Sequence, residues 1–364
     1  MRRRSRSCYG DRPVSLERRP DLNTPPGTTS VAAHLLSRLA PHAGGYIADA
    51  RIRPIEYLPW VVAIIIYFAA PDYLPLGSTI LILMLFALSL DLILGYGGII
   101  TLGHTAYFGI GAYSAGILAK FVTAEPFTGL VVAAVCAGVF GLITGAVILR
   151  TTGLTLLMLT LAITSICYEV ANKANAWTGG ADGLSGITMN PLLGQFRFDM
   201  FGNTAYLYSL VFLILGWWIV RRIVYSPFGA SLAGIRENPM RMHAVGAPVY
   251  GRLVMVYTIS AMIAGVAGAL LTHTTQFVGL KVLGFELAGD LLVMLILGGV
   301  GRIYGAIVGP LIYLVAQDLL AKQYPEYWYF WIGALLVVIV LFARGGLLGI
   351  VDVLRARIEK ARGR

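Results

Sequence analysis

Long apolar stretches recur along this chain from about residue 57 to residue 343. Ten of them, each roughly 16–22 residues long, lie near 57–72, 76–94, 103–121, 128–149, 153–171, 205–222, 251–272, 286–300, 303–320 and 328–343. A transmembrane helix needs about 20 apolar residues to cross the hydrocarbon core of a bilayer. Charged residues make up 13% of the chain, whereas a soluble domain carries about 25%. We therefore predict an all-α polytopic membrane protein with about ten transmembrane helices.

The positions of lysine and arginine predict how the chain is oriented. Cytoplasmic loops of membrane proteins collect positive charge. If the N-terminus is inside, fifteen of the twenty Lys and Arg residues after residue 50 fall in internal segments. The other five are Lys120, Lys173, Arg197, Lys281 and Lys322. This asymmetry predicts that both termini are cytoplasmic, and it accounts for most of the net charge of +10 without nucleic-acid binding.

The two ends of the chain differ from its centre. Residues 1–50 are rich in Arg, Pro and Ser and lack the apolar core of a signal peptide. We predict a basic, disordered extension at 1–50, a transmembrane domain at 51–349 and a basic cytoplasmic tail at 350–364; the alternative for 1–50 is a segment that touches anionic lipid. The three cysteines, Cys8, Cys136 and Cys167, imply no disulfide framework, and no cluster of side chains has the spacing of a metal site.

A glycine-dense apolar segment at 95–116 lies between two of the predicted spans. Irregular backbone at membrane depth is tolerated where protein or a water-filled path covers it, which is typical of transporters and channels. An ionised side chain at mid-bilayer costs at least about 2.5–3.5 kcal/mol, so acids within spans are candidates for function. The candidates for a translocation pathway are Asp91, Gly95, Gly97, Gly98, Thr101, His104 and Asp290. The alternative for the acids is pairing between helices, and for His104 a structural hydrogen bond.

A second group of candidates lies in the internal loop at 223–250. Ser226–Pro227 is a helix-start signal, which predicts a short helix from about Pro227 to Glu237. Pro239 predicts a second helix with Asn238 as its cap, which Gly246 and Pro248 end. Two short amphipathic helices would make a docking surface, with methionines suited to fitting a partner's groove. The alternative is an interfacial helix that lies on lipid.

The external loop at about 172–204 is the third informative segment. Loops of more than about 15 residues without secondary structure are uncommon unless they are functional. Glycines there permit turns with positive φ. We predict a surface that meets an external partner or lines the entry to the pathway, with a plain connector as the alternative. Its candidate residues are Gly179, Gly180, Asp182, Gly183, Ser185 and Gly186.

Taken together, four segments resemble one family of membrane proteins. They are 94–113, with its repeated glycines; 178–187; the loop pieces 226–229, 235–238 and 244–246; and 297–301, followed by Gly305 and Gly309. Over about residues 55–355 the chain is similar to the permease subunits of branched-chain amino acid (leucine/isoleucine/valine) ABC importers. It resembles the longer of their two permease types. Asp290 also matches the family's acidic position before its Gly–Gly pair.

The resemblance implies a transport complex in the bacterial inner membrane. Its other parts would be a sister permease that forms a heterodimer with this chain, two cytoplasmic ATPase subunits and an external solute-binding protein. The internal loop would be the ATPase-coupling segment, with Ser226, Pro227, Phe228, Gly229, Ile235, Arg236, Glu237, Asn238, Ala244 and Gly246 as its candidate residues. The loop departs from the widespread Glu–Ala–Ala…Gly coupling pattern, since it offers Glu237 and then 244–246.

The sequence predicts a transport subunit rather than an enzyme. No Gly-x-x-x-x-Gly-Lys-Ser/Thr phosphate loop is present, so we expect no cofactor bound directly and ATP with Mg²⁺ to be used by the partner subunits. Ser185 lies in a Gly-x-Ser-Gly pattern, but its polar external loop argues against an intramembrane protease. An ion-coupled secondary transporter is a further alternative, and so are urea, short amides or aromatic acids as the solute.

Overall fold

A computed structural model describes residues 58–69, 71–191, 202–323, 325–342, 346, 347 and 349. In these ranges the regular structure is helical, and the one β-type feature there is an isolated antiparallel bridge between Leu184 and Val278. The all-α fold class is therefore confirmed for this part of the chain. The predicted extension at 1–50 and the predicted tail at 350–364 lie outside the described residues.

Each of the ten predicted spans contains a helix. These helices are α2 (Leu58–Ala69), α3 (Leu74–Asp91), α4 (His104–Phe121), α5 (Pro126–Ile148), α6 (Leu154–Lys173), α8 (Asn203–Val224), α11 (Val249–Thr275), α12 (Phe285–Gly298), α13 (Gly305–Gln323) and α14 (Trp328–Phe342). Within the described residues, six helical segments are long and apolar enough to cross a bilayer: Pro71–Tyr96, which contains α3, and helices α5, α6, α8, α11 and α13. A polytopic membrane protein is supported, while ten crossings stay a prediction.

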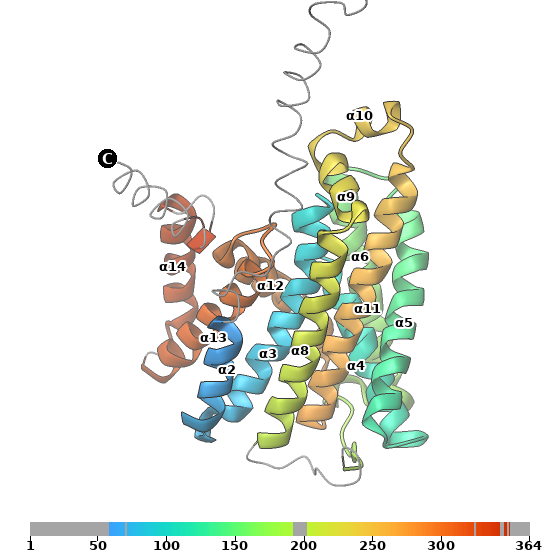
Figure 1. The fold of residues 1–364 in the computed structure, drawn as a ribbon. Helices are drawn as coiled ribbons and strands as arrows, with labels where there is room; N and C mark the ends of the chain where they lie inside the picture. The colour runs from blue at the N-terminus through green and yellow to red at the C-terminus, as the bar shows by residue number, and fades with distance from the viewer. Residues whose placement is uncertain are drawn as a thin grey trace, which may run out of the picture. The chain divides into compact units, whose positions relative to one another are not determined.

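Shorter elements connect the long helices. They are η2 (Pro71–Tyr73), the π-helical turn η3 (Leu92–Tyr96), α7 (Asn175–Thr178), η4 (Gly180–Asp182), α9 (Pro227–Glu237), α10 (Pro239–Ala244) and η5 (Leu280–Leu283). Proline begins α9 and α10, where its fixed φ suits the first turn and its missing N–H costs nothing. Figure 1 shows α9 and α10 at the upper end of the bundle, above α8 and α11.

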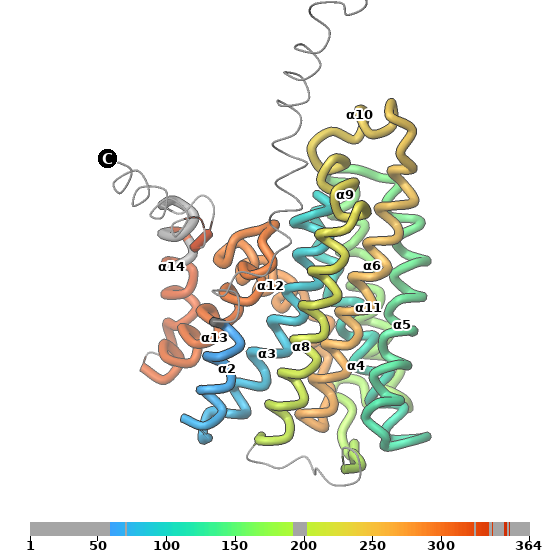
Figure 2. The backbone as a smooth tube through the Cα atoms, in the orientation of Figure 1, coloured from blue at the N-terminus to red at the C-terminus, as the bar shows by residue number. Residues whose placement is uncertain are grey.

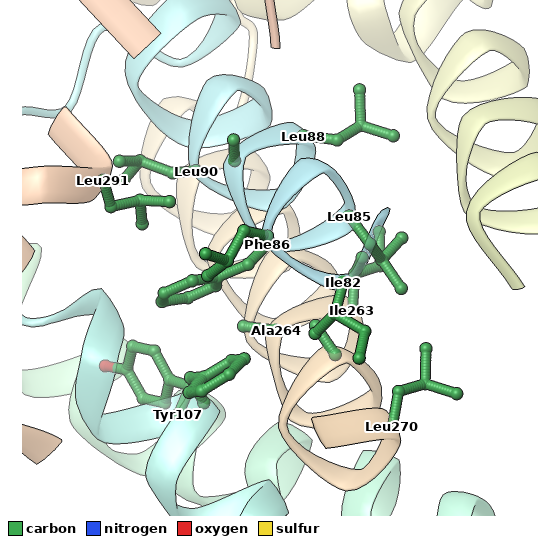
Figure 3. Packing of buried hydrophobic residues seen from close by; sticks show 14 of the residues in the cluster. Ile82, Leu85, Phe86, Leu88, Leu90, Tyr107, Ile263, Ala264, Leu270 and Leu291 are labelled. Atoms are coloured by element: carbon green, nitrogen blue, oxygen red, sulfur yellow. The ribbon is translucent and has the colours of Figure 1, made fainter. Parts of the chain in front are cut away.

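Helix α11 lies at the centre of the bundle. It packs against α5, α4 and α3, and α3 packs in turn against α8 and α13 (Figure 2). Figure 3 shows Phe86 of α3 in the core near Tyr107 of α4 and Ala264 of α11. The Phe86 ring also stacks on Phe108, with 4.3 Å between the ring centroids. These contacts fix α3, α4 and α11 as one rigid group.

Glycines allow several helices to approach closely. A Cβ on Gly145 of α5 would lie 2.8 Å from Cδ1 of Tyr257 on α11. A Cβ on Gly298 at the end of α12 would lie 3.0 Å from the backbone nitrogen of Gly309 on α13. Lipid gives no hydrophobic driving force for helix association, so close van der Waals packing of this kind supplies much of the free energy of association. Gly145 and Gly298 therefore pack α5 against α11 and α12 against α13.

Candidate functional site

The internal loop folds into the two helices that its sequence predicts. The Ser226 side chain accepts a hydrogen bond from the Gly229 N–H at 3.4 Å and caps α9. The Asn238 side chain accepts one from the Arg241 N–H at 3.1 Å and caps α10. Gly246, with φ of 84°, follows α10. Helix caps of this kind stabilise helices by about 1 kcal/mol, which keeps two short helices in place outside the bundle.

The two helices of the loop meet their surroundings differently. On α9, Ile235 is buried and Phe228 packs against the core, so this helix is anchored to the bundle. On and after α10, Met240 is 78% exposed and Val245 is 82% exposed. Glu237 and Ala244 are exposed as well. Apolar side chains displayed outward on an anchored helix pair are suited to docking against another protein.

The glycine break begins where α3 changes into the π-helical turn η3. Asp91, the last residue of α3, is 1% exposed, and its Oδ1 accepts a hydrogen bond from the Gly301 N–H at 2.7 Å. One turn later, the Gly95 carbonyl accepts a hydrogen bond from Nη1 of Arg236 on α9. The break therefore contacts α9 and the loop after α12, a juxtaposition that sequence reasoning did not predict.

The other residues of the break take up local positions. Gly98 has φ of 71°, in the region that favours glycine. A Cβ on Gly97 would lie 2.7 Å from the carbonyl oxygen of Ile93, so a larger residue does not fit. Thr101 accepts a hydrogen bond from the Gly103 N–H at 3.1 Å through its side chain. The segment is thus a compact, ordered connection between η3 and α4.

His104, the first residue of α4, is fully inside the bundle. Its Nε2 lies 2.9 Å from the Ser89 hydroxyl on α3 and 3.3 Å from the Ser260 hydroxyl on α11. The Ser260 hydroxyl also donates to the Ser89 carbonyl. The contacts join three helices, so they fit the structural alternative for this histidine; its place on a pathway stays a prediction.

Asp290 lies in α12 and faces α13. Its Oδ1 accepts a hydrogen bond from the Tyr313 hydroxyl at 2.7 Å. This contact corresponds to the pairing of helices that the sequence left open as the alternative. Two other acids near the ends of spans form ion pairs one turn apart, Glu169 with Lys173 at 3.3 Å and Asp318 with Lys322 at 2.6 Å.

The described part of the external loop, up to residue 191, packs on the opposite end of the bundle from α9. All four of its predicted turn glycines have positive φ: Gly179, Gly180, Gly183 and Gly186. The loop is held by the bridge between Leu184 and Val278 and by a hydrogen bond of 3.1 Å from the Lys120 ammonium to the Ser185 carbonyl. Asp182, Ser185 and Gly186 are exposed, so they form an accessible surface.

Two apolar cavities lie between the long helices. One, of about 490 Å³, is lined by α4, α5 and α6 and includes Tyr113 and Cys167. The other, of about 500 Å³, is lined by α2, α3, α8 and α13. None of the predicted pathway residues lines either cavity. Their walls suit acyl chains or apolar side chains of a neighbouring subunit better than a charged solute.

Comparison with known proteins places this arrangement in a family. The family model described as branched-chain amino acid transport system, permease component, matches residues 75–340. The chain belongs to this permease family. It is 25% identical to the high-affinity branched-chain amino acid transport system permease protein LivM of Escherichia coli (strain K12) over 294 residues, which cover 75% of this chain and 69% of that protein.

Archaeal relatives of both permease types also match. The probable permease protein LivM of Methanocaldococcus jannaschii is 25% identical over 244 residues, 62% of this chain and 68% of that protein. The probable permease protein LivH of the same organism is 27% identical over 254 residues, 66% of this chain and 77% of that protein. No solved structure matches the chain. These relatives are transport permease subunits rather than enzymes, and this chain is a transport subunit of the same family.

Proposed function

We propose that this chain is a membrane-spanning subunit of an ATP-driven ABC importer for branched-chain or related amino acids. Membership of the permease family supports the solute class, since the relatives are named for branched-chain amino acid transport. Two permease types among the relatives support a heterodimer with a sister permease. Two cytoplasmic ATPase subunits and an external solute-binding protein complete the proposed complex, which lies in the bacterial inner membrane.

The observation that carries the proposal is the capped helix pair α9–α10 at one end of the bundle. Its anchored half, with Ile235 buried, is joined to a displayed half, with Met240 and Val245 exposed. A partner that binds the outward apolar surface can move the helix pair, and the anchored half transmits this movement to the bundle. In this proposal the ATPases bind this surface, hydrolyse ATP with Mg²⁺, and move the subunit between outward-facing and inward-facing states.

The charges of the described segments support the proposed orientation. Seven arginines lie at or near the α9 end of the bundle: Arg150, Arg221, Arg222, Arg236, Arg241, Arg252 and Arg302. Four lysines, Lys120, Lys173, Lys281 and Lys322, lie toward the other end. The excess of positive charge supports a cytoplasmic position for the α9 end. The loop at 175–191 then faces outward, where it would meet the solute-binding protein.

Reconstitution tests the proposal directly. The permease pair, the ATPases and the binding protein are placed in liposomes, and leucine uptake is measured with and without ATP. We expect uptake that requires both ATP and the binding protein. Uptake that persists without ATP but follows a proton or sodium gradient would refute the proposal in favour of a secondary transporter.

The docking surface has its own test. We expect Met240→Glu to lower the amount of ATPase that co-purifies with the permease pair, because it places a charge on an exposed apolar contact. Lys173→Ala, at the opposite end of the bundle, is the control and should leave co-purification unchanged. The solute would be identified by a thermal-shift screen of the solute-binding protein of the proposed complex, in which leucine, urea, short amides and aromatic acids are compared for the rise in Tm that each causes.

A further inference from the structure

Three segments that are far apart in the sequence meet at one point beside α9. They are the turn η3, the last turn of α9 and the loop between α12 and α13. Nη1 of Arg236 donates a hydrogen bond to the Gly95 carbonyl, across 141 residues of sequence. The Gly301 N–H donates one to Oδ1 of Asp91, across 210 residues. We refer to Asp91, Gly95, Arg236 and Gly301 as the junction.

The junction is assembled at backbone contact. A Cβ on Gly95 would lie 2.6 Å from the nitrogen and 2.7 Å from the Cα of Gly301. Gly98 has φ of 71°, and a Cβ there would lie 3.0 Å from Cγ of Arg236. Gly301 has φ of 78°, and a Cβ there would lie 3.0 Å from Nη1 of Arg236. Glycine at these positions lets η3 and the α12–α13 loop touch through their backbones and leaves room for the Arg236 side chain beside both. Any displacement of one segment therefore acts on the others directly.

The junction also carries opposite charges, a buried carboxylate on Asp91 and the guanidinium of Arg236, which is an exposed residue on α9. Asp91 is 1% exposed, and its Oδ2 has no hydrogen-bond partner. Arg236 is the cation of the junction, and its guanidinium reaches the Gly95 carbonyl, one turn after Asp91. The two side chains are linked through the peptide groups of Gly95 and Gly301. A carboxylate buried in this way depends on the nearby guanidinium and on the Gly301 N–H for its stability.

The loop after α12 is rich in glycine. Helix α12 ends at Gly298, and Gly299 and Gly301 both have positive φ, at 110° and 78°. Glycines at successive positions of a short loop make a hinge of low resistance. On the other side, the η3 turn is continuous with α3, which lies in the core. A shift of α9 would thus change the contacts of Arg236 with both the η3 turn and Gly301 of the loop.

We propose that Arg236 and Asp91 are positioning residues that couple α9 to the α12–α13 loop. This inference rests on the proposed function, in which the ATPases move the α9–α10 pair. With Arg236 on Gly95 and Gly301 on Asp91, the loop is locked as the structure has it. Movement of α9 withdraws the guanidinium, the carboxylate loses its compensating charge, and the loop is released. Hydrogen bonds weaken steeply with distance, so a displacement of about 1 Å is enough to switch the junction.

The test uses the complete transporter in liposomes and measures two rates, leucine uptake and ATP hydrolysis. Arg236→Ala, Arg236→Lys and Asp91→Asn are compared with the wild type. We expect each complex to assemble and hydrolyse ATP, while the ratio of uptake to hydrolysis falls at least tenfold for Arg236→Ala and Asp91→Asn and less for Arg236→Lys. Arg222→Ala removes an exposed arginine at the same end of the bundle and should keep the wild-type ratio.

The ratio separates coupling from structural support. If uptake and hydrolysis fall together so that their ratio is unchanged, the junction only supports the structure and the proposal is overturned. If Arg236→Ala does not assemble, Arg236→Lys and Asp91→Asn decide by the same ratio. If uptake by the wild-type complex itself does not require ATP, the proposed function fails instead, which distinguishes the two failures.

Discussion

Gly268 of α11 offers a direct test of how this bundle is held together. It faces α4, and a Cβ at this position would lie 2.8 Å from the backbone nitrogen of Ala112 and 3.0 Å from the carbonyl carbon of Phe108. The carbonyl oxygen of Phe108 lies closer still to this Cβ. Non-bonded heavy atoms of this kind need about 3.5 Å, so Gly268→Ala would force α4 and α11 apart by more than about 0.7 Å. Backbone atoms cannot turn aside as a side chain can, and the two helices must move as whole bodies.

The expected cost of Gly268→Ala follows from three contributions. Overpacking of a tight interface costs about 1–3 kcal/mol, and rigid backbone neighbours place this site at the upper end. The hydrogen bond of 2.9 Å from the Thr272 hydroxyl to the Ala112 carbonyl lies one turn away and weakens, which costs about 0.6 kcal/mol in a membrane protein. Alanine regains about 1 kcal/mol of helix propensity. We expect a net loss of about 2–3 kcal/mol in the free energy of unfolding.

The matched control is Gly251→Ala in the same helix, where a Cβ would meet nothing within 4 Å. This variant keeps the gain in helix propensity without the clash, so its free energy of unfolding should rise by up to about 1 kcal/mol. Both variants are unfolded by SDS in mixed micelles and followed by tryptophan fluorescence. Equal stabilities for the two variants would show that α4 and α11 do not meet at Gly268, and the reasoning would be wrong.

Three further predictions concern a helix cap, a hydrogen bond between helices and the orientation of the chain. Asn238→Ala removes the cap of α10, so we expect ATPase binding to weaken by about 1 kcal/mol, or roughly fivefold, in a titration of purified subunits. Tyr313→Phe removes the hydrogen bond to Asp290, and the free energy of unfolding should fall by about 0.6–1.7 kcal/mol; no change would remove this contact from the account of α12–α13 pairing. In a cysteine-free background, Ser185→Cys should react with an impermeant maleimide from outside intact cells and Met240→Cys only after permeabilisation; the reverse pattern would invert the proposed orientation.

Much of the fold could be predicted from the sequence because its signals are local. The start of α9 at Pro227 and of α10 at Pro239 follows from proline and its preceding cap, which act within three or four residues. The positive φ of Gly179 and Gly183 follows from the freedom of glycine. The apolar stretches likewise predict the ten long helices, because a span must satisfy its own backbone hydrogen bonds.

The junction could not be predicted in the same way. Arg236 looks from the sequence like part of the polar side of a docking helix, yet its guanidinium contacts Gly95 in the membrane domain. Gly301 reads as one member of a packing stripe, yet its N–H binds Asp91. Both contacts join residues more than 140 positions apart, and only the packing of whole helices decides them. The one available signal was that a buried acid needs a donor, which names no partner.

The junction also restricts the topology of the chain. Its hydrogen bonds require Gly95, Arg236 and Gly301 to lie on the same side of the bilayer, because its hydrocarbon core is about 30 Å thick. The number of crossings between Gly95 and Arg236 must then be even, and four long helices, α4, α5, α6 and α8, lie there.

The same parity applies between Arg236 and Gly301, where the long helices are α11 and α12. Helix α11, with 27 residues, is long enough to cross, so the same parity favours the predicted return of the chain through α12. The 14 residues of α12 span only about 21 Å at 1.5 Å per residue. Helix α12 alone is therefore shorter than the hydrocarbon core, and η5 and the α12–α13 loop continue the path at its two ends.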